Sequence, residues 1–266
     1  DRNRTSPFAF TGNKFEFRAV GSSQNVGIPA TILNAAVTDV LKDVNVRITK
    51  EKADGKGNDD ILMGIIKDLY NNSKPAVFNG DGYSQDWQDE AAKRGLPNLK
   101  TSADALRVIK DSNANKFLMD QGIYTPSELE TRYNVRVERY CACRNIEFNT
   151  MVSMIHKDIL PASINYKNEL ATAIVNQKAA GVEAKADLEL LKSVNTGVES
   201  LVTDTKKMLA ELEKHAGQDD IEYASKIAND LLPLSEKMAD TIAFLEENVS
   251  EDLWPLPTYF DMLFIR

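Results

Sequence analysis

Thr125-Pro126-Ser127-Glu128 opens the segment that decides the fold of this chain. A threonine before a proline, with a glutamate three residues on, is typical of a capped helix start. Apolar residues then recur three and four positions apart, the spacing of an amphipathic helix. They are Leu129, Tyr133, Val137, Tyr140, Phe148, Val152 and Ile155. The pattern predicts a very long helical stretch, which Pro161 should kink or break.

Two more helical stretches follow with the same spacing. The first spans residues 190–212 and ends at Gly217, a residue typical of helix C-termini. The second starts at Asp219 or Asp220 and continues to Leu245. Helices of this length joined by short turns predict an antiparallel bundle or an extended coiled pair.

The segments before these helices are shorter and more mixed. Pro29 can begin a helix that includes the apolar positions of residues 32–41. A polar, glycine-containing stretch at 53–60 indicates a boundary, after which helical spacing resumes over 61–69. Ser84 can cap a further helix that extends to Arg94.

Near the start of the chain lies a short segment with strand-like alternation. Phe15 and Phe17 fall on one face, and Lys14, Glu16 and Arg18 fall on the other. The two cations lie about 7 Å from the carboxylate along the strand, which favours an ionised acid. An ionised carboxylate is a hard oxygen ligand that suits Mg²⁺.

Arginines near this strand add the means to hold an anion. Arg4 and Arg18 can each bind a carboxylate or phosphate through two hydrogen bonds. A metal ligand together with arginines that bind anions is typical of phosphoryl-transfer sites. Spacing alone leaves an alternative open, because alternating charges are also common on a solvent-facing strand.

Composition and charge exclude several classes of function. The chain has 266 residues and a net charge of −8 without a block of Lys or Arg, which argues against nucleic acid and anionic membrane as partners. No apolar run is long enough to span a membrane. The only cysteines, Cys141 and Cys143, are too close for a relaxed disulfide and too few for a zinc site. These features predict a cytoplasmic protein.

Three other features are assigned no chemistry. His156 and His215 lie in helical segments, where a lone histidine is usually a surface or packed residue. The loop at 79–82 has glycines but lacks the acidic ligands of a calcium loop, so it is interpreted as a structural turn. The apolar stripes between residues 190 and 245 favour packing within the bundle over a partner-binding face.

Several segments of the sequence resemble the type III branch of the glutamine synthetases. The segment Asn3-Arg4-Thr5-Ser6 followed by the strand at 14–18 is similar to the catalytic domain of the whole family. Three longer stretches resemble the type III branch in particular, and they lie at residues 1–18, 78–84 and 253–259. The last of these is apolar and fixed by prolines, so we expect it to pack onto the body of the protein.

The resemblance implies roles for four residues. Glu16 would ligate Mg²⁺ or Mn²⁺, and Arg18 would contact glutamate or its γ-phosphoryl group. Arg4 would neutralise phosphate, and Lys14 would lie beside the nucleotide of ATP. One position departs from the commoner bacterial pattern, because Ala9 stands where that pattern has an arginine.

The resemblance also implies an architecture and an assembly. The expected fold class is α+β, predominantly α, with the end of a catalytic β-barrel domain followed by a long-helix bundle. Expected domains are the catalytic piece at 1–55, connecting helices at 56–125, the bundle at 126–250 and the tail at 251–266.

The expected activity is the joining of glutamate and ammonia with ATP through a γ-glutamyl phosphate, in a ring-shaped oligomer such as a dodecamer. Since the first residue is Asp1, the chain is interpreted as starting inside a domain, and alone it should be inactive. The alternative is a non-catalytic helical oligomerisation or interaction module.

Overall fold

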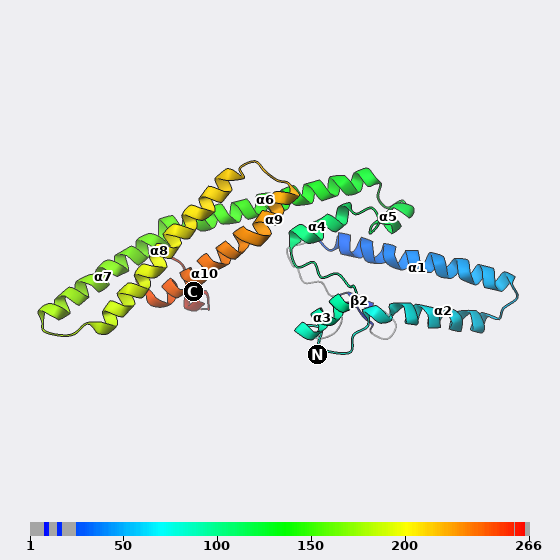
Figure 1. The fold of residues 1–266 in the computed structure, drawn as a ribbon, viewed down its shortest axis with the longest axis horizontal. Coiled ribbons are helices and arrows are strands. Elements are labelled where there is room, and N and C mark those ends of the chain that lie inside the picture. The colour runs from blue at the N-terminus through cyan, green and yellow to red at the C-terminus, as the bar shows by residue number, and fades with distance from the viewer. Residues whose placement is uncertain (1–7, 11–14, 18–24, 258, 264–266) are drawn as a thin grey trace. The chain divides into compact units, whose positions relative to one another are not determined.

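A computed structural model describes residues 8–10, 15–17, 25–257 and 259–263, and these are predominantly helical (Figure 1). The chain divides into two compact units. The first comprises residues 1–100 and 108–130, and the second comprises residues 101–107 and 131–266. The predominantly α class predicted from the sequence is therefore confirmed.

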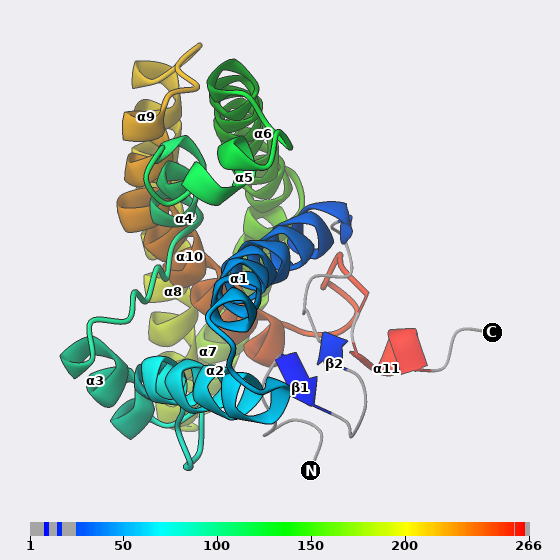
Figure 2. The same cartoon turned by 90° about the vertical axis from the view of Figure 1, so that its right-hand side faces the viewer.

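The strands of the first unit form one small sheet. β1 (Phe8–Phe10) and β2 (Phe15–Phe17) pair antiparallel, with Phe8 opposite Phe17 and Phe10 opposite Phe15 (Figure 2). A closed barrel needs many more strands. The described residues therefore do not contain the expected catalytic β-barrel, and that part of the fold prediction has no counterpart in them.

Helices α1 (Gly27–Ala53) and α2 (Asn58–Ser73) form a helical hairpin in the first unit. Asn25 holds the first turn of α1, because its Oδ1 accepts a hydrogen bond from the Gly27 amide at 2.7 Å. The turn between the helices passes through Gly55, whose φ of 84° suits glycine. The stretch at 53–60 is thus a tight turn between packed helices.

Short helices continue the first unit. They are η1 (Lys74–Ala76), α3 (Gln85–Lys93), α4 (Ser102–Lys110), which runs from residues of the second unit into the first, and α5 (Lys116–Asp120). The predicted cap is confirmed, because Ser84 Oγ accepts a hydrogen bond from the Trp87 amide. Phe78 stacks on Trp87 at 4.4 Å, and Arg94 donates to the Val77 carbonyl at 2.7 Å. These contacts fix the loop at 79–82 as a structural turn.

Long helices form the second unit, where their ribbons lie side by side (Figure 1). In chain order they are α6 (Pro126–Met154), η2 (Ile155–Ile159), α7 (Leu160–Ala179), α8 (Lys185–Lys214), α9 (Ile221–Lys226), η3 (Ile227–Leu231) and α10 (Leu232–Asn248). A last short helix, α11 (Tyr259–Leu263), follows. α8 packs against both α7 and α10, so the predicted bundle is present.

The starts of α6 and α9 follow the capping rules read from the sequence. At the start of α6, Thr125 Oγ1 accepts from the Glu128 amide at 3.2 Å, and Glu128 accepts from the Thr125 amide at 2.8 Å. This reciprocal pair is the predicted capping box. Asp220 caps α9 by accepting from the amides of Glu222 and Tyr223.

Two prolines sit inside helical runs without ending them. Pro161 follows the π-helical segment η2, and Pro233 follows the π-helical segment η3. A proline lacks the amide needed for an ordinary i to i−4 bond, and a wider π turn rearranges the bonds just before it. The chain therefore stays helical past Pro161, where the sequence predicted a kink or a break.

A buried acid on α8 is held by two neighbours. Asp204 is 6% exposed, and its Oδ2 accepts hydrogen bonds from Lys237 Nζ at 2.7 Å and Ser200 Oγ at 3.1 Å. Because the lysine comes from α10, this ion pair joins two helices. Burying an acid is costly unless it is paired in this way.

Within the described part of the tail only Trp254 has a buried side chain, so the packing of the whole segment 251–266 stays a prediction. Trp254 is 8% exposed, while Met262 and Leu263 in α11 are largely exposed. No helix among the residues described is both long and apolar enough to cross a membrane.

Replacing Gly197 by alanine tests how closely α8 approaches α10. A Cβ at this position would lie 3.2 Å from Cδ2 of Leu245, which is fully buried. Alanine gains about 1 kcal/mol of helix propensity over glycine, but overpacking a core costs about 1–3 kcal/mol. We expect Gly197→Ala to lower the free energy of unfolding by about 1 kcal/mol in urea denaturation.

Gly64→Ala in α2 is the matched control. Its Cβ would lie 3.1 Å from Nη2 of Arg47, the movable end of a side chain that is 36% exposed. This variant should be neutral or gain up to about 1 kcal/mol. Equal effects of the two substitutions would contradict the close packing of α8 on α10.

Candidate functional site

The structure places one of the four predicted site residues on a described element. Glu16 lies in β2, and its Cα is paired with that of Ala9 in β1. Ala9 is also the position at which the sequence departs from the commoner pattern. Arg4, Lys14 and Arg18 lie outside the described residues, so the proposed convergence of the four side chains stays a prediction.

The described residues do not contain a complete metal site. No group of three or more His, Cys, Asp or Glu side chains gathers among them in a way that could hold a metal ion. Mg²⁺ takes oxygen ligands in octahedral geometry and is often held by one or two carboxylates with waters and phosphates. The chemistry of Glu16 fits one such ligand and no more.

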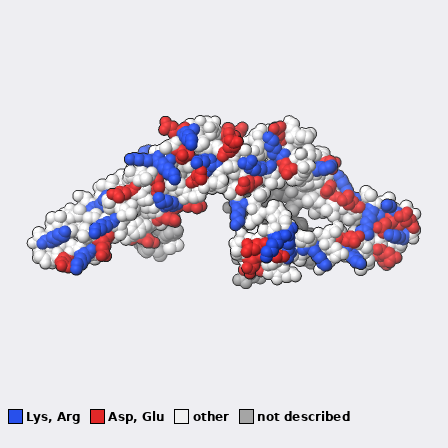
Figure 3. Space-filling model, in the orientation of Figure 1, with Lys and Arg blue, Asp and Glu red and all other residues white. Residues whose placement is uncertain are grey.

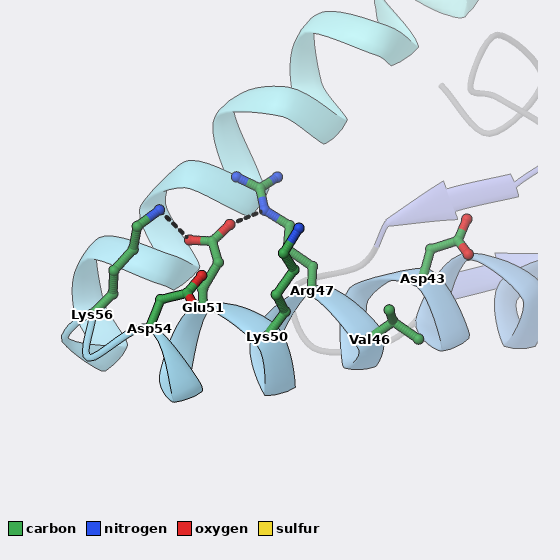
Figure 4. Close-up of a pocket in the computed structure, with 7 residues that line it drawn as sticks. All are labelled: Asp43, Val46, Arg47, Lys50, Glu51, Asp54 and Lys56. Carbon is green, nitrogen blue, oxygen red and sulfur yellow. Dashed lines mark hydrogen bonds and ion pairs between the residues drawn. The ribbon is translucent and has the colours of Figure 1, made fainter.

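A charged hollow of about 450 Å³ lies at the turn between α1 and α2 (Figure 4). Its lining residues are Asp43, Val46, Arg47, Lys50, Glu51, Asp54 and Lys56. Acidic and basic side chains alternate over this end of the hairpin (Figure 3). Sequence reasoning treated this segment only as a boundary.

Glu51 is the centre of the charged hollow. Its Oε1 accepts from Arg47 Nε at 2.6 Å, and its Oε2 accepts from Lys56 Nζ at 2.9 Å. Arg47 Nη1 also donates to Asp68 Oδ2 on α2 at 2.8 Å. Hydrogen bonds from Arg47 first, and then from Lys56, lower the pKa of Glu51. Since both oxygens are engaged, the hollow fits a structural tie between α1 and α2 better than a ligand site.

A second polar cluster lies where α8 ends and α9 begins. The imidazole of His215 stacks on the Tyr223 ring at 5.0 Å, and its Nδ1 lies 2.6 Å from Gln218 Oε1. Glu211 Oε2 lies 3.7 Å from both His215 Nε2 and Lys226 Nζ. Sequence patterns did not indicate this cluster, because Tyr223 and Lys226 reach His215 and Glu211 only when α9 folds back on α8.

Cys141 lies beside this cluster. The thiol is fully buried, and its Sγ donates to the Asp220 carbonyl at 3.7 Å. Burial first, and then the nearby charges of Asp219 and Asp220, raise the pKa of Cys141 to about 11. Only a thiolate is a strong nucleophile or metal ligand, so this cysteine is held in an unreactive form.

The other histidine, His156, is an exposed residue of η2. Its Nε2 lies 3.1 Å from Thr205 Oγ1 on α8. Thr205 is buried and also donates to the Leu201 carbonyl at 2.7 Å. This contact joins two helices through a surface histidine, which agrees with a residue that carries no chemistry of its own.

Comparison with known proteins confirms the resemblance drawn from the sequence. Residues 61–178 match the family described as the glutamine synthetase C-terminal domain. A glutamine synthetase of Bacteroides fragilis (strain YCH46) is 33% identical over 274 aligned residues, which cover 100% of this chain and 37% of that protein. A type-3 glutamine synthetase of Dictyostelium discoideum is 34% identical with the same coverage. The chain thus spans little more than a third of these relatives.

Substitution of Glu51 tests the tie between α1 and α2. Because its pKa is lowered in the folded chain, the stabilisation is present above the ordinary glutamate pKa of about 4.3 and is lost as pH falls through the lowered value. We expect Glu51→Gln to reduce the free energy of unfolding at about pH 7 and to lose most of that difference at about pH 3. Urea denaturation at both pH values measures it.

Asp54→Asn is the control for this prediction. Asp54 lines the same hollow, and its carboxylate makes no hydrogen bond or ion pair with the residues that the structure describes. This change should leave the free energy of unfolding nearly unaltered at both pH values. A pH dependence equal to that of the Glu51 variant would refute the tie.

Proposed function

Because this chain matches the C-terminal part of type III glutamine synthetases over its whole length, we propose that it is part of an enzyme that joins ammonia to L-glutamate with ATP. The observation that carries the proposal is the 33% identity along the entire chain, including the segment around Glu16. A non-catalytic helical module is the alternative. It is not favoured, because it gives no reason for the likeness to include the front strand.

In the proposed reaction, an oxygen of the glutamate γ-carboxylate attacks the γ-phosphorus of ATP, and ADP leaves. The product is γ-glutamyl phosphate. The nitrogen of ammonia then attacks the carbonyl carbon of the acyl phosphate, phosphate leaves with the bonding electron pair, and a proton is released. Glutamine, ADP and phosphate are the products. Each step gathers negative charge at the phosphoryl group, so cations are the groups that the site needs.

Four residues of this chain supply such groups in the proposal. Arg18 orients the glutamate carboxylate or its phosphoryl group, and Arg4 neutralises the phosphate as it forms. Lys14 lies beside the nucleotide. Glu16 ligates a divalent cation, and Mg²⁺ or Mn²⁺, when bound, supplies further charge neutralisation. Successive side chains of a strand point to opposite faces, and this alternation supports the placement of Lys14, Glu16 and Arg18 on one face.

The proposal includes an organisation of the chain around that site. Residues 1–55 belong to the catalytic domain, 56–125 connect it to the long helices, 126–250 form the helical extension and 251–266 are its packed tail. The other metal ligands come from regions of the relatives that this chain does not span. The enzyme acts in the cytoplasm.

Self-association into a ring, such as a dodecamer, is part of the same proposal. Large apolar side chains stay exposed on α1 and α2, more than a monomer usually leaves in one region. They are Ile32, Val37, Val40, Leu41, Val46, Leu62, Met63, Ile66, Leu69 and Tyr70. Their exposure in this chain is consistent with burial in a larger assembly.

Replacement of Glu16 in the full-length enzyme tests the catalytic role. Loss of one metal ligand removes several kcal/mol of transition-state stabilisation, so we expect Glu16→Ala to lower kcat for glutamine formation by at least about 100-fold. Size-exclusion chromatography should show an unchanged assembly. Unchanged turnover would instead support the helical module.

Glu183→Gln provides a control for that experiment. Glu183 lies between α7 and α8, and its side chain is 79% exposed beside Lys185. An exposed ion pair of this kind contributes little, so activity and assembly should match those of the parent enzyme.

The 266-residue chain alone should form no glutamine. The described residues hold a single predicted metal ligand, and one carboxylate does not complete an octahedral site. A coupled assay for ADP release with glutamate, ammonia, ATP and Mg²⁺ measures this. Glutamine formation by the chain alone would show that it contains a complete site.

A further inference from the structure

Two buried polar atoms face each other at the corner between α8 and α9. Nε2 of His215 and Oε2 of Glu211 are shielded from solvent and lie 3.7 Å apart, and neither has a hydrogen-bond partner within the described part of the chain. A buried polar atom without a partner is costly. A single proton on Nε2 would satisfy both atoms, because it would turn the pair into a charge-assisted contact.

The contact made by Nδ1 determines which nitrogen of the neutral imidazole carries the proton. Nδ1 of His215 is 2.6 Å from Gln218 Oε1, and a carbonyl oxygen only accepts, so Nδ1 carries a proton. In the neutral ring, Nε2 then presents a lone pair to the Glu211 carboxylate. In the charged ring, both nitrogens donate, one to Gln218 and one to Glu211.

Groups from three elements surround the ring. Tyr223 on α9 stacks on it at 5.0 Å with an interplanar angle of 16°. His215 caps the C-terminus of α8, where the helix dipole favours a cation. Glu211 on α8 adds a negative charge, and the Cys141 thiol and the Asn145 amide of α6 are neutral.

Lys226 on α9 is the opposing charge. Its Nζ lies 3.7 Å from Glu211 Oε2, but only 2.6 Å from Asp230 Oδ2 in η3. The shorter pair commits the ammonium mainly to Asp230, which leaves Glu211 available to the imidazole. The loop carboxylates are Asp219 and Asp220, and Asp220 is already engaged as the cap of α9.

We propose that this corner is a proton-sensitive latch. When His215 binds a proton, its ring bridges Glu211 and Gln218 and holds the end of α8 to the turn that leads into α9. When the proton leaves, the contact between Nε2 and Glu211 is lost, Glu211 keeps its ion pair with Lys226 at 3.7 Å, and the corner loosens.

The latch acts on a hollow beside it. Gln218, together with Gly217 and Asp219, lines a hollow of about 460 Å³ whose other wall includes Cys141 and Asn145. The imidazole holds Gln218 directly, so its protonation fixes one wall of this hollow. Burial of Tyr223 against α6 would be relaxed by the same change.

Nuclear magnetic resonance of the imidazole nitrogens tests the first step, because the chain has only two histidines. At about pH 8.5 we expect neutral His215 to carry its proton on Nδ1, and at about pH 5.5 both nitrogens should be protonated. His156, whose Nε2 lies beside the Thr205 hydroxyl, is the reference signal. A neutral ring with its proton on Nε2 would overturn the proposal.

A double-mutant cycle tests the latch itself in the full 266-residue chain. His215→Gln and Glu211→Gln are made singly and together, and unfolding in urea is measured at both pH values. We expect a coupling of about tenfold in the unfolding equilibrium constant at about pH 5.5, and less than about twofold at about pH 8.5.

The matched control pairs His156→Gln with Glu211→Gln, and these changes should be additive at both pH values. Coupling of His215 to Glu211 that is equal at the two pH values, or absent at the lower one, would overturn the latch. The cycle measures unfolding equilibrium constants of variants that are compared at the same pH. This measurement does not require glutamine synthesis, so failure of the latch and failure of the proposed function can be distinguished.

Discussion

Burial of one side of α8 between α7 and α10 is the interaction on which the second unit depends. An isolated helix gains little stability in water, so helices of this length need a packed face. Val194, Val198, Leu201 and Met208 supply that face on α8 and are almost completely buried. Gly197 allows Leu245 of α10 to approach the backbone. Polar residues on the same face are accepted only where a neighbour satisfies them, as Lys237 does for the buried carboxylate of α8.

Sequence rules that act within one or two helical turns predicted this structure well. The caps at Thr125 with Glu128 and at Ser84 involve atoms three residues apart, so the residue types alone specify them. For α9 the sequence left Asp219 and Asp220 open, and the structure has Asp220 as the cap. Apolar spacing predicted the first half of α1, whereas its second half is more polar and includes Arg47, which contacts α2. Arg47 and Asp68 are far apart in the sequence, and only the hairpin brings them together.

At the candidate site, too, the sequence predicts local structure but not the contacts that depend on tertiary folding. Alternation of side chains predicted a strand at Glu16, and β2 forms there. Whether Arg4 and Arg18 approach that carboxylate depends on tertiary folding outside the described residues, which spacing does not determine. The corner at His215 was missed for a related reason, since its polar partners come from two helices and the turn between them. The resemblance to the glutamine synthetases was instead recognised from particular segments of the sequence, and the relatives support that resemblance along the full length of the chain.

The two cysteines of α6 have opposite environments although they are only two residues apart. Cys141 is buried and Cys143 is exposed, since positions separated by two lie on different sides of a helix. A water-soluble thiol reagent therefore meets one cysteine in the folded chain and reaches the other only when α6 separates from its neighbours. The reaction rate of the exposed thiol is an internal standard for the reagent, and the reaction rate of the buried thiol reports local opening. The chain thus contains its own pair of chemical reporters, without any engineered label.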